Sequence, residues 1–177
     1  MEPKPRQSFF RRLAIVLSLA LAPAALGAGG DARALRLFHT HTGETLAVTY
    51  YENGSYSPQA LAQLVDFLSD WRNGRQHEID PELLDILWRI QLAGRHVSTW
   101  EVISAYRSPE TNEMLRSRSG GVARKSQHLE GKAIDVRLRG MDTRELQRLA
   151  LELRSGGVGY YEKSDFVHVD TGRVRRW

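Results

Sequence analysis

The chain has 177 residues, which is enough for one domain with a substantial core and too few for two ordinary domains. It contains no cysteine, so a thiolate nucleophile, cysteine-ligated zinc and disulfide bonds are excluded. Residues 1–28 hold four of the 25 basic residues and one of the 21 acidic residues, so the remainder keeps 21 basic and 20 acidic residues. That near balance, without a long basic run, argues against nucleic-acid binding.

The first segment has the layout of a secretory signal peptide, which we assign to residues 1–28. A basic stretch leads into an apolar run from Leu13 to Leu26 and then into small residues. The run is too short and too poorly flanked for a stable membrane span, and an uncleaved N-terminal anchor is the alternative. The pair Arg11-Arg12 fits a twin-arginine route as well as a Sec signal. We therefore expect residues 29–177 to form an exported, soluble, monomeric domain without a lasting membrane anchor, in the periplasm or cell envelope.

The rest of the chain predicts helices early and strands late. Residues 34–51 are typical of a hairpin, because two β-rich runs flank a turn. Two helices follow, each opened by a capping side chain and a proline, at Ser57-Pro58 and Asp80-Pro81. The remaining predicted elements are a strand over 100–108, a short helix from Pro109 to about Arg118, a strand over 132–139, a helix over 142–154, and the strands VGYY and FVHVD. This order favours an α+β fold with a central antiparallel sheet and helices packed on one side.

The predicted strand 132–139 presents a carboxylate on its open face. Its apolar residues alternate on one side, which leaves Asp135 on the other beside the small Ala133. His128 lies on the loop that enters this strand, and Gly131 allows a tight turn between the two. A histidine and an aspartate near a strand are commonplace, so this pair alone is weak support for a metal site.

A second strand supplies another imidazole. In FVHVD the valines share one face, while Phe166, His168 and Asp170 share the other. If this strand pairs with 132–139, His168 and Asp135 project from the same side of the sheet. Two imidazoles and one carboxylate, with a fourth position left for water, form the ligand set of a catalytic zinc. The alternative is that His168 is a core histidine with satisfied hydrogen bonds.

These motifs resemble the zinc peptidases of the M15 class, and more closely its exported branch of murein endopeptidases. The resemblance rests on the pattern Ser126-x-His128-x-x-Gly131-x-Ala133-x-Asp135 and on an acid-x-x-His motif that ends at His168. It extends over nearly all of residues 29–177, through the segments LFHTHTGETL, IDPELLDIL, EVISAYRSPETN, SQHLEGKAIDV and GGVGYYEKSDFVHVDTGRVRRW. It implies a Hedgehog/DD-peptidase-like fold, with Zn2+ as cofactor and peptidoglycan as substrate.

The resemblance also implies roles for single residues. His128, Asp135 and His168 match the zinc ligands, and Asp165 matches the general base. Strict alternation places Asp165 on the face opposite His168, so this role requires an irregular strand entrance or a bulge; the alternative is that Asp165 caps a turn. Arg107 matches an arginine near the site, which would stabilise an oxyanion or bind a substrate carboxylate.

Two further residues have roles with open alternatives. Ser126 matches a serine that contacts substrate, and a loop-capping role is equally compatible with its position. Asp170 shares the face of His168, from which it can orient the imidazole. His39 and His41 are two residues apart in the first hairpin, where such pairs also arise by chance, and we do not predict them as ligands.

The sequence therefore predicts a zinc metallopeptidase that hydrolyses amide bonds in peptidoglycan cross-links or stem peptides. The first alternative is a non-catalytic peptidoglycan-binding module that retains the fold. An acid at position 165 and an arginine at position 107 favour the enzyme, because a binding module needs no general base. A metal-storage or sensing protein is a further alternative, which the spread of the ligands over separate strands disfavours.

Overall fold

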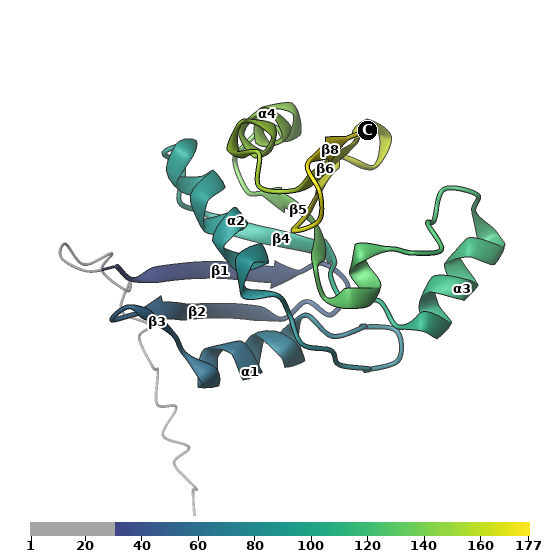
Figure 1. Cartoon of the computed structure of the whole chain (residues 1–177), viewed down its shortest axis with the longest axis horizontal. Coiled ribbons are helices and arrows are strands. Elements are labelled where there is room, and N and C mark those ends of the chain that lie inside the picture. The colour runs from purple at the N-terminus through teal and green to yellow at the C-terminus, as the bar shows by residue number, and fades with distance from the viewer. Residues whose placement is uncertain (1–30) are drawn as a thin grey trace, which may run out of the picture.

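The computed structural model describes residues 31–177 as an α+β domain built on one eight-stranded sheet (Figure 1). The predicted signal peptide, residues 1–28, lies outside the described residues. The elements are β1 (Arg33–His39), β2 (Thr45–Glu52), β3 (Ser55–Tyr56), α1 (Pro58–Phe67), α2 (Pro81–Ala93), β4 (Thr99–Ser104), α3 (Pro109–Arg118), η1 (Gln127–Glu130), β5 (Ala133–Leu138), α4 (Thr143–Leu153), β6 (Gly157–Tyr161), η2 (Glu162–Ser164), β7 (Phe166–Asp170) and β8 (Arg175–Arg176). Over residues 31–177, no helix has the length and apolar character needed to cross a membrane.

The sheet is mixed, which corrects the predicted antiparallel sheet. Its strand order is β3-β2-β1-β4-β5-β7-β6-β8, and both β1–β4 and β6–β8 are parallel pairs. The chain passes from β2 to β4 through α1 and α2, and this long connection lets β4 return parallel to β1. The β6–β7 hairpin and the turn after it bring β8 back beside β6 in the same direction.

The helices begin where capping side chains satisfy their free N–H groups. Ser57, Asp80, Ser108 and Asp142 each accept a hydrogen bond from a backbone N–H in the first turn of the helix that follows. The predicted starts of all four helices are therefore confirmed. Helices α1, α2 and α4 pack against the sheet, whereas α3 lies to one side of it, next to the long loop that leads to η1 (Figure 1).

Strands β5 and β7 carry the core on one face and polar side chains on the other. Ile134, Val136 and Leu138 of β5 are at most 1% exposed and pack in one apolar cluster with Val167 and Val169 of β7. The intervening residues point to the opposite face. The antiparallel register pairs Asp135 with His168, so their side chains leave the sheet next to each other.

Candidate metal centre

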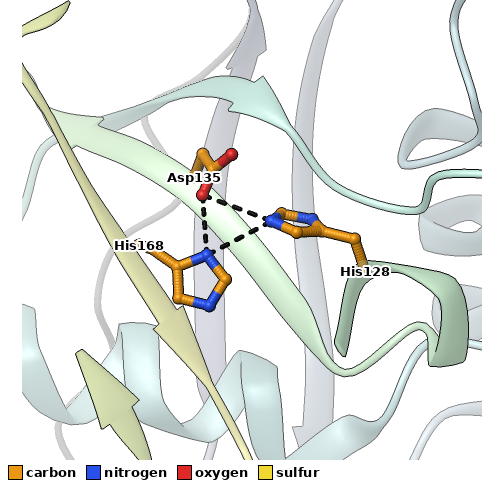
Figure 2. Close-up of side chains that lie close together, drawn as sticks. All are labelled: His128, Asp135 and His168. Carbon is orange, nitrogen blue, oxygen red and sulfur yellow. Dashed lines mark hydrogen bonds and ion pairs between the residues drawn. The ribbon is translucent and has the colours of Figure 1, made fainter. Parts of the chain in front are cut away.

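Three buried side chains converge on the polar face of the sheet (Figure 2). His128 comes from η1, Asp135 from β5 and His168 from β7. His128 Nε2 lies 3.2 Å from His168 Nδ1 and 3.3 Å from Asp135 Oδ1, and His168 Nδ1 lies 2.8 Å from the same carboxylate oxygen. The three side chains predicted as metal ligands therefore lie together.

This donor set fits a small tetrahedral metal ion. Zinc bonds of about 2.0–2.2 Å in tetrahedral geometry place neighbouring ligand atoms roughly 3.3–3.6 Å apart. The three observed separations, 2.8 to 3.3 Å, come close to this range, so a slight outward movement accommodates an ion between the three atoms. Two imidazoles and one carboxylate are also the donor types that zinc accepts in sites with an open fourth position.

The backbone around η1 fixes the orientation of His128. Its Nδ1–H donates to the Ala105 carbonyl at 2.6 Å, which leaves the Nε2 lone pair directed at the cluster. The Arg107 N–H in turn donates to the His128 carbonyl at 3.1 Å. This bond links η1 to the segment that follows β4. Ser126 Oγ accepts from the His128 N–H at 3.3 Å and thereby caps this turn. Gly131 ends the turn in the left-handed region, with φ +64°.

Asp170 orients the second imidazole. Its Oδ2 lies 2.9 Å from His168 Nε2, so Nε2 carries a proton and Nδ1 is the ring nitrogen that can offer a lone pair to a metal ion. The carboxylate is fully buried and accepts further hydrogen bonds from the Gly157 and Gly172 N–H groups and the Arg175 guanidinium. A carboxylate behind a histidine is the usual support of metal-binding imidazoles.

The electrostatics of the cluster keep its carboxylates ionised. Burial raises the pKa of Asp135, but the charges and hydrogen bonds of His128 and His168 outweigh it and hold the pKa below its usual range. Burial likewise raises the pKa of Asp170, but the hydrogen bonds from His168 and Arg175 outweigh this effect and hold the pKa below its usual range. Both carboxyl groups are therefore charged at neutral pH, as a cation site requires.

The cluster forms the floor of a cavity of about 510 Å³, and Arg107 lies in its wall. Burial lowers the pKa of Arg107, although the charge of Asp135 raises it in part. Its terminal NH1 donates to Asn112 Oδ1 at 3.3 Å, whereas its buried Nε has no hydrogen-bond partner within residues 31–177. A buried cationic donor without a partner suits an anionic or carbonyl oxygen of a ligand. Ser126 also lines this cavity.

The segment after Arg107 is anchored by Asp70, a residue that we did not single out from the sequence. The Asp70 carboxylate is fully buried and accepts from the Ser108 N–H at 3.0 Å and the Ser108 hydroxyl at 2.7 Å. Ser108 Oγ in turn caps α3 through the Thr111 N–H. These bonds fix the backbone next to Arg107. Asp70 follows α1 without a periodic or motif signal that distinguishes it from an ordinary loop aspartate.

Asp165 is the one predicted site residue that the structure does not bring to the cluster. Its Oδ1 accepts from the Thr143 hydroxyl at 2.7 Å, and Arg137 lies beside it. Asp165 lines a separate hollow with these two residues, and its backbone lies in the left-handed region with φ +50°. Among the described residues that line the larger cavity, Asp135 is the only one with a carboxylate.

The histidine pair of the first hairpin stays apart from the metal cluster. His39 is buried in β1, and its Nδ1 accepts from the backbone N–H groups of His41 and Thr42. These contacts close the turn between β1 and β2. Three aromatic side chains, Tyr161, Phe166 and Trp177, instead line the cavity of the cluster.

A family model and several curated proteins match the chain, and they point to the same family. Residues 27–177 match the M15-class peptidase family model described as "Peptidoglycan L,D-endopeptidase MepK". The chain is 43% identical over 146 residues to the Peptidoglycan L,D-endopeptidase MepK of Escherichia coli (strain K12), covering 82% of this chain and 80% of that protein. It is 42% identical over 146 residues to the Probable peptidoglycan L,D-endopeptidase MepK of Haemophilus influenzae, covering 82% and 78%. No solved structure matches the chain.

The family model covers most of the chain, and the relatives are similar over four fifths of their own length. The chain therefore belongs to the M15 metallopeptidases, in the family described as peptidoglycan L,D-endopeptidase MepK.

Proposed function

We propose that this protein is a zinc-dependent peptidoglycan endopeptidase that hydrolyses an L,D-amide bond in the peptide cross-links. The convergence of His128 Nε2, Asp135 Oδ1 and His168 Nδ1 in the floor of an open cavity carries the proposal. The names of the similar proteins supply the substrate and the bond type. A binding module without catalysis has no use for a three-ligand site that opens into a cavity, so we do not favour it.

His128, Asp135 and His168 would hold the zinc ion, and Asp170 would keep the His168 ring in place. Bound zinc acidifies a water molecule and polarises a carbonyl group. The protein itself supplies the orientation: Ala105 fixes one imidazole tautomer and Asp170 fixes the other. The Hedgehog/DD-peptidase-like fold remains part of this proposal and rests on the family resemblance.

The charge of the cavity wall suits a substrate with carboxylates. Arg107 and Lys125 line the cavity, and both carry a positive charge. Stem peptides carry free carboxyl groups beside their amide bonds, so a cationic wall would bind them and keep the chain extended across the metal. Arg107 would contact either such a carboxylate or the carbonyl oxygen that gains charge during hydrolysis.

Asp165 stands at the position of the predicted general base, three residues before His168. To act on a water molecule at the cluster, its side chain would have to leave Thr143 and turn toward the cavity. Its role as base therefore remains a prediction. We further propose that residues 1–28 direct export, and that the remainder acts as a monomer in the periplasm or cell envelope.

The test is digestion of purified cross-linked muropeptides by zinc-loaded protein, with His168→Ala and Asp165→Asn beside the wild type. The wild type should yield monomeric products, and His168→Ala should lose both zinc and turnover. Asp165→Asn should retain zinc; loss of its turnover identifies the base, and full turnover removes Asp165 from the mechanism. A wild type that binds muropeptides without cleaving them would overturn the proposal in favour of the binding module.

A further inference from the structure

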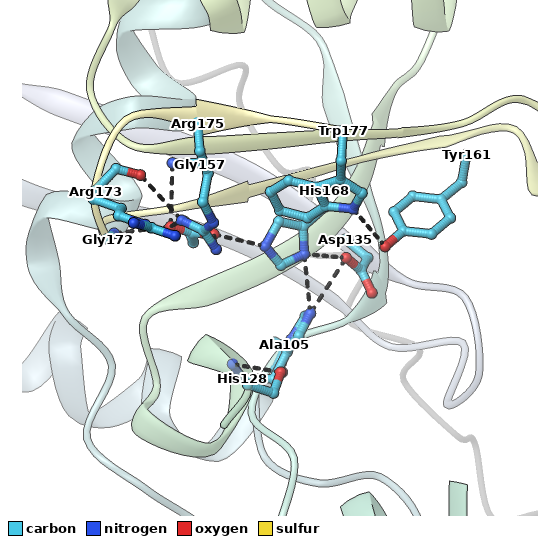
Figure 3. A network of polar contacts seen from close by, with 12 residues as sticks. Ala105, His128, Asp135, Gly157, Tyr161, His168, Gly172, Arg173, Arg175 and Trp177 are labelled. Carbon is cyan, nitrogen blue, oxygen red and sulfur yellow. Dashed lines mark hydrogen bonds and ion pairs between the residues drawn. The ribbon is translucent and has the colours of Figure 1, made fainter. Parts of the chain in front are cut away.

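The cavity has a second wall, formed by β6 and the segment 175–177. After β8, Trp177 continues along β6: its N–H donates to the Val158 carbonyl, and its carbonyl accepts from the Tyr160 N–H, both at 3.2 Å. The indole ring lies beside His168, with ring centroids 5.1 Å apart, and remains 49% exposed (Figure 3). A large aromatic side chain therefore stands directly beside a proposed metal ligand, and it is anchored by its own backbone.

A glycine in β6 makes room for this indole. A Cβ on Gly159 would lie 2.5 Å from the Trp177 ring, closer than real side chains approach. Gly159 pairs with His168 in the β6–β7 register, so the ring fills the space where a side chain next to that ligand would stand. The absence of a side chain at position 159 thus places Trp177 in the cavity wall.

The indole also fixes a hydroxyl group. Trp177 Nε1–H donates to Tyr161 Oη at 3.0 Å. An indole N–H can only donate, so the tyrosine oxygen accepts here and its own hydrogen is free for another acceptor. The Tyr161 ring is stacked on the Phe166 ring, with ring centroids 4.6 Å apart, and this contact restricts the rotation of the tyrosine ring. Tyr161, Phe166 and Trp177 line the same cavity as Asp135 and His168.

We propose that Trp177 positions Tyr161, whose hydroxyl donates a hydrogen bond to the carbonyl oxygen of the scissile amide. This assignment rests on the proposed endopeptidase function. A donor held in place before substrate arrives is effective where negative charge develops, because it needs no reorganisation during the reaction. In this arrangement Tyr161 touches the substrate, and Trp177 acts through Tyr161 as a positioning residue.

The kinetic test is a double-mutant cycle with Tyr161→Phe and Trp177→Phe, measured as kcat and KM on defined cross-linked muropeptides with zinc-loaded protein. Tyr161→Phe should lower kcat/KM roughly 100-fold, mainly through kcat, as loss of one donor to a developing oxyanion does. Trp177→Phe should lower kcat/KM about 5-fold, because it removes the single hydrogen bond that orients Tyr161. The double variant should be no slower than Tyr161→Phe alone, because both changes remove one chain of interactions.

Multiplicative effects in the double variant, or a Tyr161→Phe loss confined to KM, would overturn the assignment. Gly159→Ala is a second route to the same result, because it displaces the indole while both aromatic residues remain. It should match Trp177→Phe in kcat/KM and leave bound zinc unchanged. Trp71→Phe is the matched control: Trp71 is also partly exposed but does not line the cavity, and its kinetics should equal those of the wild type.

A spectroscopic test of the hydrogen bond does not depend on activity. The chain has four tryptophans, and each indole N–H gives a separate proton–nitrogen NMR signal. Tyr161→Phe should shift the Trp177 signal and leave those of Trp71, Trp88 and Trp100 in place; an unchanged Trp177 signal would overturn the positioning role. A wild type without endopeptidase activity would refute the proposed function instead, and this NMR result would stand apart from it.

Discussion

Asp170 does not line the cavity, but its carboxylate orients the imidazole of His168, a proposed metal ligand. Its carboxylate joins the His168 imidazole to the Arg175 guanidinium and to two backbone N–H groups. These bonds hold the carboxylate charged while it is fully buried, and the charged carboxylate holds the ring. Metal affinity should therefore depend on a side chain that is not itself a ligand.

Substitution of Asp170 by Asn should lower zinc affinity about 10- to 100-fold, the usual effect of removing such a support from a ligand histidine. The variant keeps the size of the side chain but loses the charge that fixes the imidazole tautomer. Competition with a chromophoric chelator measures the affinity. Asp165→Asn is the control, because Asp165 contacts Thr143 and not the cluster; an equal loss in both variants would contradict the supporting role.

The sequence indicates that Asp135 and His168 lie together because strand alternation is strict. The two-residue period places Asp135 and His168 on one face, and the register of β5 with β7 sets them opposite each other. The same rule indicated that Asp165 needs an irregular backbone. The structure has one, with φ +50°, yet the side chain turns to Thr143, a partner 22 residues away that no local pattern indicates.

Among the elements, the short turn η1 places His128, the third proposed ligand, at the cluster. His128 is held by the Ala105 carbonyl through its ring and by Arg107 through its backbone. The turn can end only at Gly131, where φ is +64° and a Cβ would lie 1.9 Å from the Glu78 carbonyl oxygen. Both the backbone conformation and the available space therefore require glycine.

Gly131→Ala should destabilise the fold by at least about 1–2 kcal/mol, the cost of the left-handed conformation alone, with the clash against Glu78 added to it. Chemical denaturation measures the free energy of unfolding, and zinc titration of the folded variant should show weakened binding, since the turn carries His128. Gly120→Ala is the matched control: that glycine has no positive φ and no atom within 4 Å of its added Cβ. Equal stability of the two variants would refute this account.

Element boundaries are predictable where the chemistry is local. The four helix starts follow from capping side chains, and in α1, α2 and α3 a proline comes directly after the cap. The parallel pairing of β1 with β4 is not local. It depends on the long connection through α1 and α2, which lets β4 run in the same direction as β1. The pairing of β8 is not local either, because its two residues form a strand only through their parallel pairing with β6.

At the scale of the whole molecule, a bound metal ion would tie η1, β5 and β7 together. An ion that binds the folded state alone stabilises it by about 2.7 kcal/mol at one hundred times its dissociation constant. For a domain of this size, zinc should raise the melting temperature by roughly 5–10 °C. Calorimetry with and without a chelator measures the shift. His128→Ala should show no such response, and an equal shift in that variant would indicate zinc binding elsewhere.

The separation of the proposed ligands along the chain determines when, during synthesis and folding, the site can form. His128 and Asp135 are synthesised 40 and 33 residues before His168, and these positions meet only after β7 has paired with β5. A nascent chain that stops at β6 contains two of the three proposed ligands but lacks His168, Asp170 and Trp177. Under the proposed function, hydrolytic capacity therefore arises in one step, when β7 pairs with β5 and brings His168 beside Asp135.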